Sequence, residues 1–124
     1  MRQLLLVGLG GFIGSVARFW VSKLNLHLHF LSIPIGTLTV NIIGSLIIGF
    51  LAGISAKSEI LSPSLRLFLM VGICGGFTTF SSFTNENLTL IQNGQIFSML
   101  LYTGLSIMFG FFAVYLGYII SNLL

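Results

Sequence analysis

Apolar residues follow one another along almost the whole chain, and the few charged positions divide it into long blocks. No Asp, Glu, Lys or Arg occurs in residues 24–56, 67–85 or 87–124. A membrane-spanning helix needs about 20 predominantly apolar residues. The blocks predict four spans, at about residues 4–23, 34–55, 64–91 and 96–121.

Turn signals separate these predicted spans. The polar residues 57–59 indicate water after the second span, and Ser62 before Pro63 is typical of a helix cap followed by a proline at the first helical position. Ser32, shortly before Pro34, suggests a similar start for the second span. The stretch 92–95 (QNGQ) is a turn that divides the last block.

Composition supports a chain that lies within the bilayer. Of its 124 residues, 56% are hydrophobic and 6% are charged, and the mean hydropathy is +1.09. Soluble domains carry about 25% charged residues. We therefore expect an all-α membrane protein whose residues 1–124 form one transmembrane domain.

Several function classes lack their usual residues. The net charge of +3 comes from scattered Lys and Arg, without a nucleic-acid-binding patch. Cys74 is the one cysteine, and the spacing of a metal site is absent. No nucleophile and base occur in a catalytic arrangement, so we do not expect an enzyme.

The first residues also resemble a signal peptide. Arg2 would be the short basic region, and Ser15, Val16 and Ala17 a possible cleavage site. We favour an uncleaved first span, because cleavage would leave three helices and remove the glycines described below.

Cations are almost balanced across the membrane. Four spans place Arg2, Lys57 and Arg66 on one side and Arg18 and Lys23 on the other. This small positive-inside bias permits insertion in both orientations. The alternative is one orientation that a short loop makes hard to assign.

Small residues four positions apart give each span a face that another helix can approach closely. The pairs are Gly10 with Gly14, Gly49 with Gly53, Gly72 with Gly76, and Ser106 with Gly110. Because this motif is common in membrane helices, it predicts tight packing rather than a function.

The stretch 72–86 (GICGGFTTFSSFTNE) is the most polar part of the third span. Gly75, Gly76 and the β-branched Thr78 and Thr79 all weaken the helix, so we expect a break near the middle of the span. Backbone carbonyls freed there could hold a cation. The alternative is a kink whose carbonyls neighbouring hydroxyls satisfy.

Aromatic and hydroxyl groups share one face after this break. A helix would align Phe80, Phe83 and Thr84. Ring edges are positive, so together with hydroxyls they could bind a small anion and still release it. Alternatively, the rings only fill space or face lipid.

Further polar residues could join such a site. An unpartnered amide is costly in lipid, so Asn41 needs a partner, which could be an anion, a freed carbonyl or another helix. Tyr102 and Ser106 align two hydroxyls in the fourth span. Glu86 and Arg18 lie near span ends and could shape a pore mouth or simply reach water.

These residues resemble those of the Fluc, or CrcB-type, fluoride channel family. The resemblance rests on residues 75–83 (GGFTTFSSF) leading to Glu86, residues 36–44 (GTLTVNIIG), and residues 10–14 (GGFIG) ahead of Arg18. It covers essentially the whole chain. It implies an antiparallel, dual-topology homodimer in the bacterial inner membrane, with two pores that export fluoride passively.

The resemblance also implies roles for individual residues. A structural sodium ion at the dimer interface would be held by the backbone carbonyls of Gly75 and Thr78, and Arg18 would belong to the vestibule. The fluoride pathway would comprise Asn41, Phe80, Phe83, Thr39, Ser81, Tyr102 and Ser106. In relatives the hydroxyls of the fourth span continue, whereas here Gly110 and Val114 follow Ser106.

Two other functions are compatible with four short spans. A small multidrug-resistance type exporter would need a carboxylate in its first span, and residues 4–23 contain none. A structural membrane subunit would use the Phe and Ser residues for packing alone. Fluoride and chloride flux would separate both from a fluoride channel.

Overall fold

The computed structural model describes residues 1–27, 29–57 and 59–124 of one subunit. Leu28 and Ser58 lie outside the described residues. In chain order the elements are α1 (Arg2–Ser22), α2 (Leu24–His27), β1 (His29–Phe30), β2 (Ile33–Pro34), α3 (Ile35–Lys57), α4 (Pro63–Arg66), the π-helix η1 (Leu67–Cys74), α5 (Gly75–Phe77), α6 (Ser81–Gln92) and α7 (Ile96–Leu123).

Four helical stretches of the described residues are long and apolar enough to cross a membrane. They are Arg2–Ser22, Ile35–Lys57, Pro63–Gln92 and Ile96–Leu123, close to the predicted spans. The third stretch combines α4, η1, α5 and α6 and includes the non-helical residues 78–80. The chain is therefore an all-helical, multi-pass membrane protein.

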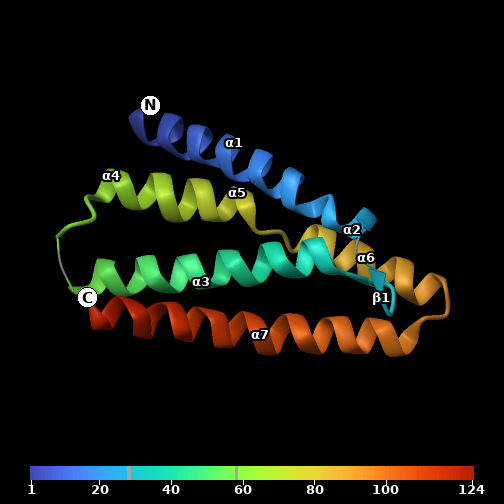
Figure 1. Ribbon diagram of the computed structural model, residues 1–124. Coiled ribbons are helices and arrows are strands. Elements are labelled where there is room, and N and C mark those ends of the chain that lie inside the picture. Colours follow the sequence, from blue (N-terminus) through green and yellow to red (C-terminus); the bar gives the residue numbers. More distant parts are fainter. Residues whose placement is uncertain (28, 58) are drawn as a thin grey trace.

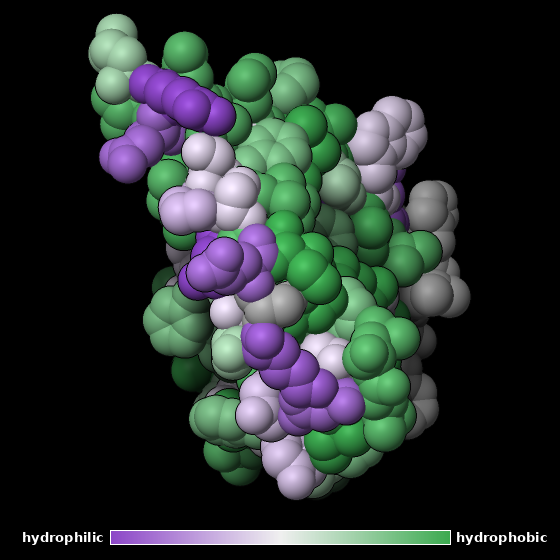
Figure 2. Space-filling view, turned by 90° about the vertical axis from the view of Figure 1, so that its left-hand side faces the viewer, coloured by the Kyte–Doolittle hydropathy of each residue, from purple (hydrophilic) through white to green (hydrophobic). Residues whose placement is uncertain are grey.

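The four stretches lie roughly side by side along one direction (Figure 1). Both chain termini and the α3–α4 connection lie at one end, whereas α2, β1 and the α6–α7 connection lie at the other. Figure 2 views the first end, where hydrophilic residues run between hydrophobic ones. This arrangement fits a bundle whose two ends face water and whose sides face lipid.

One predicted cap is confirmed and the other is wrong. Ser62 Oγ accepts a hydrogen bond from Leu65 N at 3.2 Å, with Pro63 at the start of α4. Ser32 does not cap α3, and its hydroxyl instead accepts from Gln95 Nε2 at 2.9 Å. The start of α3 is capped by Asn25, which is distant in sequence and therefore gave no local signal.

Glycines bring the helices together in two pairs. α1 packs along η1 and α5, and α3 packs along α7 (Figure 1). A Cβ at Gly14 would strike the carbonyl of Ile73, and one at Gly49 would strike the carbonyl of Val114. The prediction of tight packing is therefore confirmed at these positions. Gly110 differs, because a Cβ there would meet nothing nearer than 3.9 Å.

The third stretch leaves the helical path later than the glycines suggest. Gly75 keeps helical angles (φ −62°, ψ −38°), whereas Thr78 is extended (φ −80°, ψ 158°). A Cβ at Gly76 would lie 2.5 Å from the carbonyl of Gly11, so this glycine permits packing against α1. Gly76 therefore serves helix contact, and the departure from the helix occurs at residues 78–80.

Candidate functional site

Asn41 holds the non-helical residues of the third stretch in place. Its Nδ2 donates to the Thr79 carbonyl at 3.0 Å, and its Oδ1 accepts from Thr79 N at 2.8 Å. The side-chain amide thus replaces the backbone partners that a continuous helix would provide for Thr79. Three kinds of partner were proposed for Asn41: an anion, a freed carbonyl or another helix. The structure shows the second, because Asn41 donates to the freed carbonyl of Thr79.

The two hydrogen bonds between Asn41 and Thr79 also change the hydrogen bonding of Gly75. In a continuous α-helix, Thr79 N would donate to the Gly75 carbonyl four residues earlier. Here that N–H points to Asn41 Oδ1. The last carbonyls of a helix lack partners within it, and those of α5 therefore need other donors or a cation.

A cavity of about 410 Å³ lies beside Asn41 and Thr79. Its polar lining residues are Asn41, Ser45, Thr78, Thr79 and Ser106, and the rings of Phe80 and Phe83 also line it. None of the described residues that line it is charged. We call this the Asn41 cavity.

Two hydrogen-bonding groups in the Asn41 cavity have unused capacity. A side-chain amide has two N–H donors, and Asn41 uses one of them on Thr79. Ser106 Oγ is buried and has no hydrogen-bond partner among the described residues. The cavity can therefore donate hydrogen bonds to a guest without any fixed charge.

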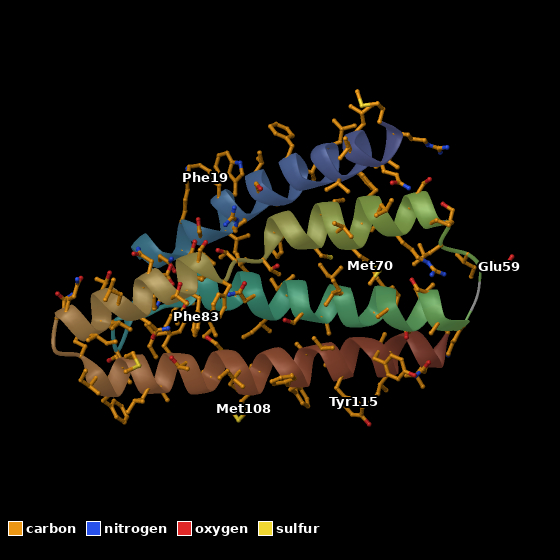
Figure 3. All side chains as sticks on the ribbon, turned by 180° about the vertical axis from the view of Figure 1, so that it is seen from behind. Phe19, Glu59, Met70, Phe83, Met108 and Tyr115 are labelled. Carbon is orange, nitrogen blue, oxygen red and sulfur yellow. The ribbon has the colours of Figure 1, made fainter. Side chains whose placement is uncertain are left out.

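Three aromatic rings form a line from the cavity into the bundle. The ring centroids of Phe80 and Phe83 are 5.9 Å apart, and those of Phe83 and Tyr102 are 5.1 Å apart. Phe83 lies between α6 and α7 (Figure 3). Phe80 is 77% exposed in this single subunit. The ring edges of Phe80 and Phe83 are thus available beside the Asn41 cavity.

A second cavity, of about 430 Å³, lies on the other side of Thr79. We call it the Arg18 cavity, and its polar lining residues are Ser15, Arg18, Ser22, Asn25, Thr37, Thr79, Ser82 and Glu86. Thr79 lines both cavities. The non-helical residues therefore separate a charged cavity from an uncharged one.

Glu86 is the centre of a hydrogen-bond network in the Arg18 cavity. Oε1 accepts from Thr37 Oγ1 at 2.6 Å, and Oε2 accepts from the Tyr102 hydroxyl at 2.7 Å. Asn25 Nδ2 donates to Thr37 Oγ1 at 3.2 Å and to Glu86 Oε1 at 3.5 Å. The carboxylate thus ties α3, α6 and α7 together, and it is not simply a solvated residue.

The remaining predicted site residues lie around these features. Thr78 lines the Asn41 cavity, and its hydroxyl donates to the Cys74 carbonyl at 2.9 Å. Tyr102 is fully buried and directs its hydroxyl to Glu86. Thr39 and Ser81 line neither cavity, as is also true of Tyr102. The structure therefore gathers Asn41, Phe80, Phe83, Ser106, Gly75 and Thr78 around one cavity and places Arg18 at the other.

Two residues have hydrogen-bonding roles that the sequence analysis did not predict: Thr79, which was expected only to weaken the helix, and Asn25. Thr79 Oγ1 accepts from Ser82 N at 3.2 Å and so supports the start of α6. Asn25 Oδ1 accepts from Gly36 N at 2.6 Å and from Thr37 N at 3.3 Å. A threonine three residues before the hydrogen-bonded amide of Ser82 is a recognisable capping signal, whereas the long-range contacts of Asn25 leave none.

The groups that line the two cavities suit a small anion. No group of three or more His, Cys, Asp or Glu side chains that could hold a metal ion occurs in the described part of the chain. The Asn41 cavity offers hydroxyl, amide and ring-edge groups, which can replace the water around an anion. The Arg18 cavity adds one cation at its wall.

Comparison with known proteins agrees over nearly the full length. The family model described as "CrcB-like protein, Camphor Resistance (CrcB)" matches residues 5–118. A protein of Azobacteroides pseudotrichonymphae named fluoride-specific ion channel FluC is 44% identical over 122 residues, 98% of both chains. A protein of the same name from Chlorobium luteolum is 48% identical over 120 residues, 97% of this chain and 92% of its own. The chain belongs to the CrcB-like family.

Proposed function

We propose that this chain is the subunit of a fluoride-specific ion channel that exports cytoplasmic fluoride passively. The observation that carries this proposal is its similarity, over nearly the full length, to proteins named fluoride-specific ion channels. Fluoride enters cells as the neutral acid and ionises in the cytoplasm. A passive anion channel is sufficient to release it, and no enzymatic step is needed.

The Asn41 cavity provides the physical basis for passing this ion. Fluoride is small and strongly hydrated, so several donors must replace its water together. The second N–H of Asn41, the Ser106 hydroxyl and the edges of Phe80 and Phe83 are such donors. Because none of them carries a full charge, the bound ion can leave again.

The Arg18 cavity acts as the vestibule in this scheme. A guanidinium at the wall of a water-accessible cavity raises the local concentration of anions. The Thr37–Glu86–Tyr102 hydrogen bonds hold the adjoining helices in register. For Thr39, Ser81 and Tyr102, direct contact with the ion stays a prediction, since none of them lines either cavity in this subunit.

The working unit in this proposal is an antiparallel homodimer with two pores. Arg2, Lys57 and Arg66 lie toward one end, and Arg18 and Lys23 toward the other, so neither orientation is strongly favoured. Phe80 and Gly75, beside the interrupted helix, are exposed in the single subunit. A second subunit would cover this face and complete the ring edges around each cavity.

A sodium ion between the subunits is part of the same proposal. The carbonyls of Gly75 and Thr78 would hold it, and the lost Thr79 donor makes Gly75 O a suitable ligand. Carbonyl oxygens are ligands that replace the hydration shell of monovalent cations. The ion would supply structural stability by neutralising carbonyl dipoles from both interrupted helices.

The runner-up function lacks its central residue. A proton-coupled small multidrug-resistance exporter needs a carboxylate in its first span, and α1 contains neither Asp nor Glu. The acidic residue of the site, Glu86, instead accepts three hydrogen bonds from its neighbours. Location in a bacterial inner membrane fits the four apolar helices and the bacterial relatives.

Fluoride efflux from liposomes tests the proposed function. Vesicles that contain the purified protein are loaded with potassium fluoride or potassium chloride, and a potassium ionophore balances the charge. We expect rapid fluoride release and chloride release no faster than from protein-free vesicles. Equal release of both halides would contradict fluoride specificity, and no release of either would contradict channel function.

A further inference from the structure

The Asn41 cavity is lined by a serine, Ser45, that is not part of the pathway predicted from the sequence. Ser45 lies one helical turn after Asn41 on α3, and both residues line this cavity together with Ser106 of α7. Residues four apart share a helix face. The face of α3 that carries the Asn41 amide therefore continues to the hydroxyl of Ser45.

The residue of the fourth span that lies opposite Ser45 is a glycine, Gly110, which has no side chain. Gly110 follows Ser106 by one turn of α7, and a Cβ built on it would have the Ser45 Oγ as its nearest neighbour, at 3.9 Å. The hydroxyl from α3 thus points to the place where a side chain of α7 would stand. The contact leaves room for a small side chain at position 110.

This open place is local, because α3 and α7 approach closely further along. A Cβ at Gly49 would strike the Val114 carbonyl, and one at Gly117 would strike the Leu46 carbonyl. Figure 1 shows the two helices side by side over their length. Gly110 is therefore not needed for helix contact, and its missing side chain leaves space in front of Ser45.

The two serine hydroxyls beside this space have no hydrogen-bond partner among the described residues. Ser106 Oγ is buried without a partner, and Ser45 Oγ has no hydrogen bond to any described residue. Buried hydroxyls normally form hydrogen bonds, and leaving them unmade lowers stability. The buried hydroxyl of Ser106 and the half-buried hydroxyl of Ser45, on facing helices, indicate a position for a hydrogen-bond acceptor.

We infer that Ser45 contacts the permeating anion and supplies, from α3, the hydroxyl that α7 lacks at Gly110. The pathway then continues from Asn41 and Ser106 to Ser45 by changing helices. This inference rests on the proposed function and extends it to a residue outside the predicted pathway. It also explains how the route continues past a position without a side chain.

Moving the hydroxyl between helices tests this inference. Ser45→Ala should lower the fluoride efflux rate about tenfold, because a hydrogen bond to a charged partner is lost. Ser45→Ala combined with Gly110→Ser restores a hydroxyl from the opposite helix, and its efflux should return to within about threefold of the wild-type rate. A purely structural role of Ser45 would not be rescued from α7.

Ser55→Ala is the matched control. Ser55 is also a serine of α3, and its Oγ is buried with no hydrogen-bond partner among the described residues. It lines neither cavity, so loss of its hydroxyl should leave efflux unchanged. If Ser45→Ala does not fold, Ser45→Thr and Ser45→Val replace it, since they share a shape and differ in the hydroxyl. We then expect efflux from the Thr variant alone.

The outcomes separate this inference from the proposed function. Wild-type vesicles that retain fluoride would overturn both. Wild-type release with equal release from Ser45→Ala would overturn only the role of Ser45. A slow Ser45→Ala variant that Gly110→Ser does not rescue would also overturn it, because the hydroxyl itself would then not be the cause.

Discussion

Two regions of this subunit are held together by different physical means. In the region of α1 with η1 and of α3 with α7, glycines such as Gly14 and Gly117 allow backbones to touch. In the region around residues 78–86, side chains such as Asn41 and Glu86 form hydrogen bonds across helices. We call these the glycine region and the polar region.

The two regions should therefore respond to different kinds of substitution: the glycine region to a change in side-chain size, and the polar region to a change in hydrogen bonding. In the glycine region the helix backbones are in contact, so an added methyl group does not fit. This contact depends on no specific hydrogen-bond donor or acceptor. The polar region contains cavities, so changes in shape are tolerated better than changes in hydrogen bonding. A substitution that changes only side-chain size should therefore have its effect in the glycine region, and one that changes only hydrogen bonding should have its effect in the polar region.

Asn41→Asp should give the largest effect, because it changes chemistry in the polar region at nearly constant size. A carboxylate cannot donate to the Thr79 carbonyl, and it repels an anion in the Asn41 cavity. We expect fluoride efflux to fall about 100-fold. Asn93→Asp makes the same change at the exposed α6–α7 turn and should leave efflux unchanged. Wild-type efflux from Asn41→Asp would remove Asn41 from the pathway.

Gly117→Ala changes size alone in the glycine region. The added methyl would strike the Leu46 carbonyl, and such overpacking costs about 2 kcal/mol of stability. Gly104→Ala in the same helix meets nothing within 4 Å and should be neutral. Thermal unfolding in detergent compares the two variants. Equal unfolding midpoints for the two variants would show that close backbone contact at Gly117 does not contribute to stability.

Tyr102→Phe removes one hydroxyl from the polar region without changing the ring. Glu86 Oε2 then loses its donor, which should destabilise the fold by about 1.5 kcal/mol. Tyr115→Phe is the matched control, because this tyrosine points away from the bundle (Figure 3). A Tyr102→Phe variant as stable as its control would mean that the network contributes no stability.

Arg18→Gln should have the smallest effect. It removes the cation of the vestibule, so fluoride efflux should fall about threefold at low ionic strength and recover in high salt. Arg2→Gln, at the other end of α1, provides the comparison. A loss that persists in high salt would point to a structural role rather than to attraction of anions.

The spans could be predicted because membrane insertion depends on local composition. Long apolar runs indicated all four apolar helices, and the QNGQ turn separates α6 from α7, with Gly94 at φ 72°. The interruption of the third span was less predictable. Glycines weaken an isolated helix, yet Gly75 and Gly76 both stay helical here, and the small size of Gly76 permits close contact with α1.

The site was only partly predictable from one sequence. Motif residues such as Asn41, Phe83 and Ser106 were named, and they line one cavity. Glu86 forms hydrogen bonds with residues 16 to 61 positions away, and no helical period relates them. Ser45 is absent from the predicted pathway, because the role inferred for it depends on the missing side chain of Gly110 on a facing helix.

The central claim is that uncharged groups on the Asn41 cavity pass fluoride and reject chloride. The reversal potential of a planar bilayer that contains the protein tests it most directly, with sodium fluoride on one side and sodium chloride at equal concentration on the other. We predict a large potential with the sign for fluoride as the permeant ion. A reversal potential near zero, which indicates equal permeability, would contradict the account.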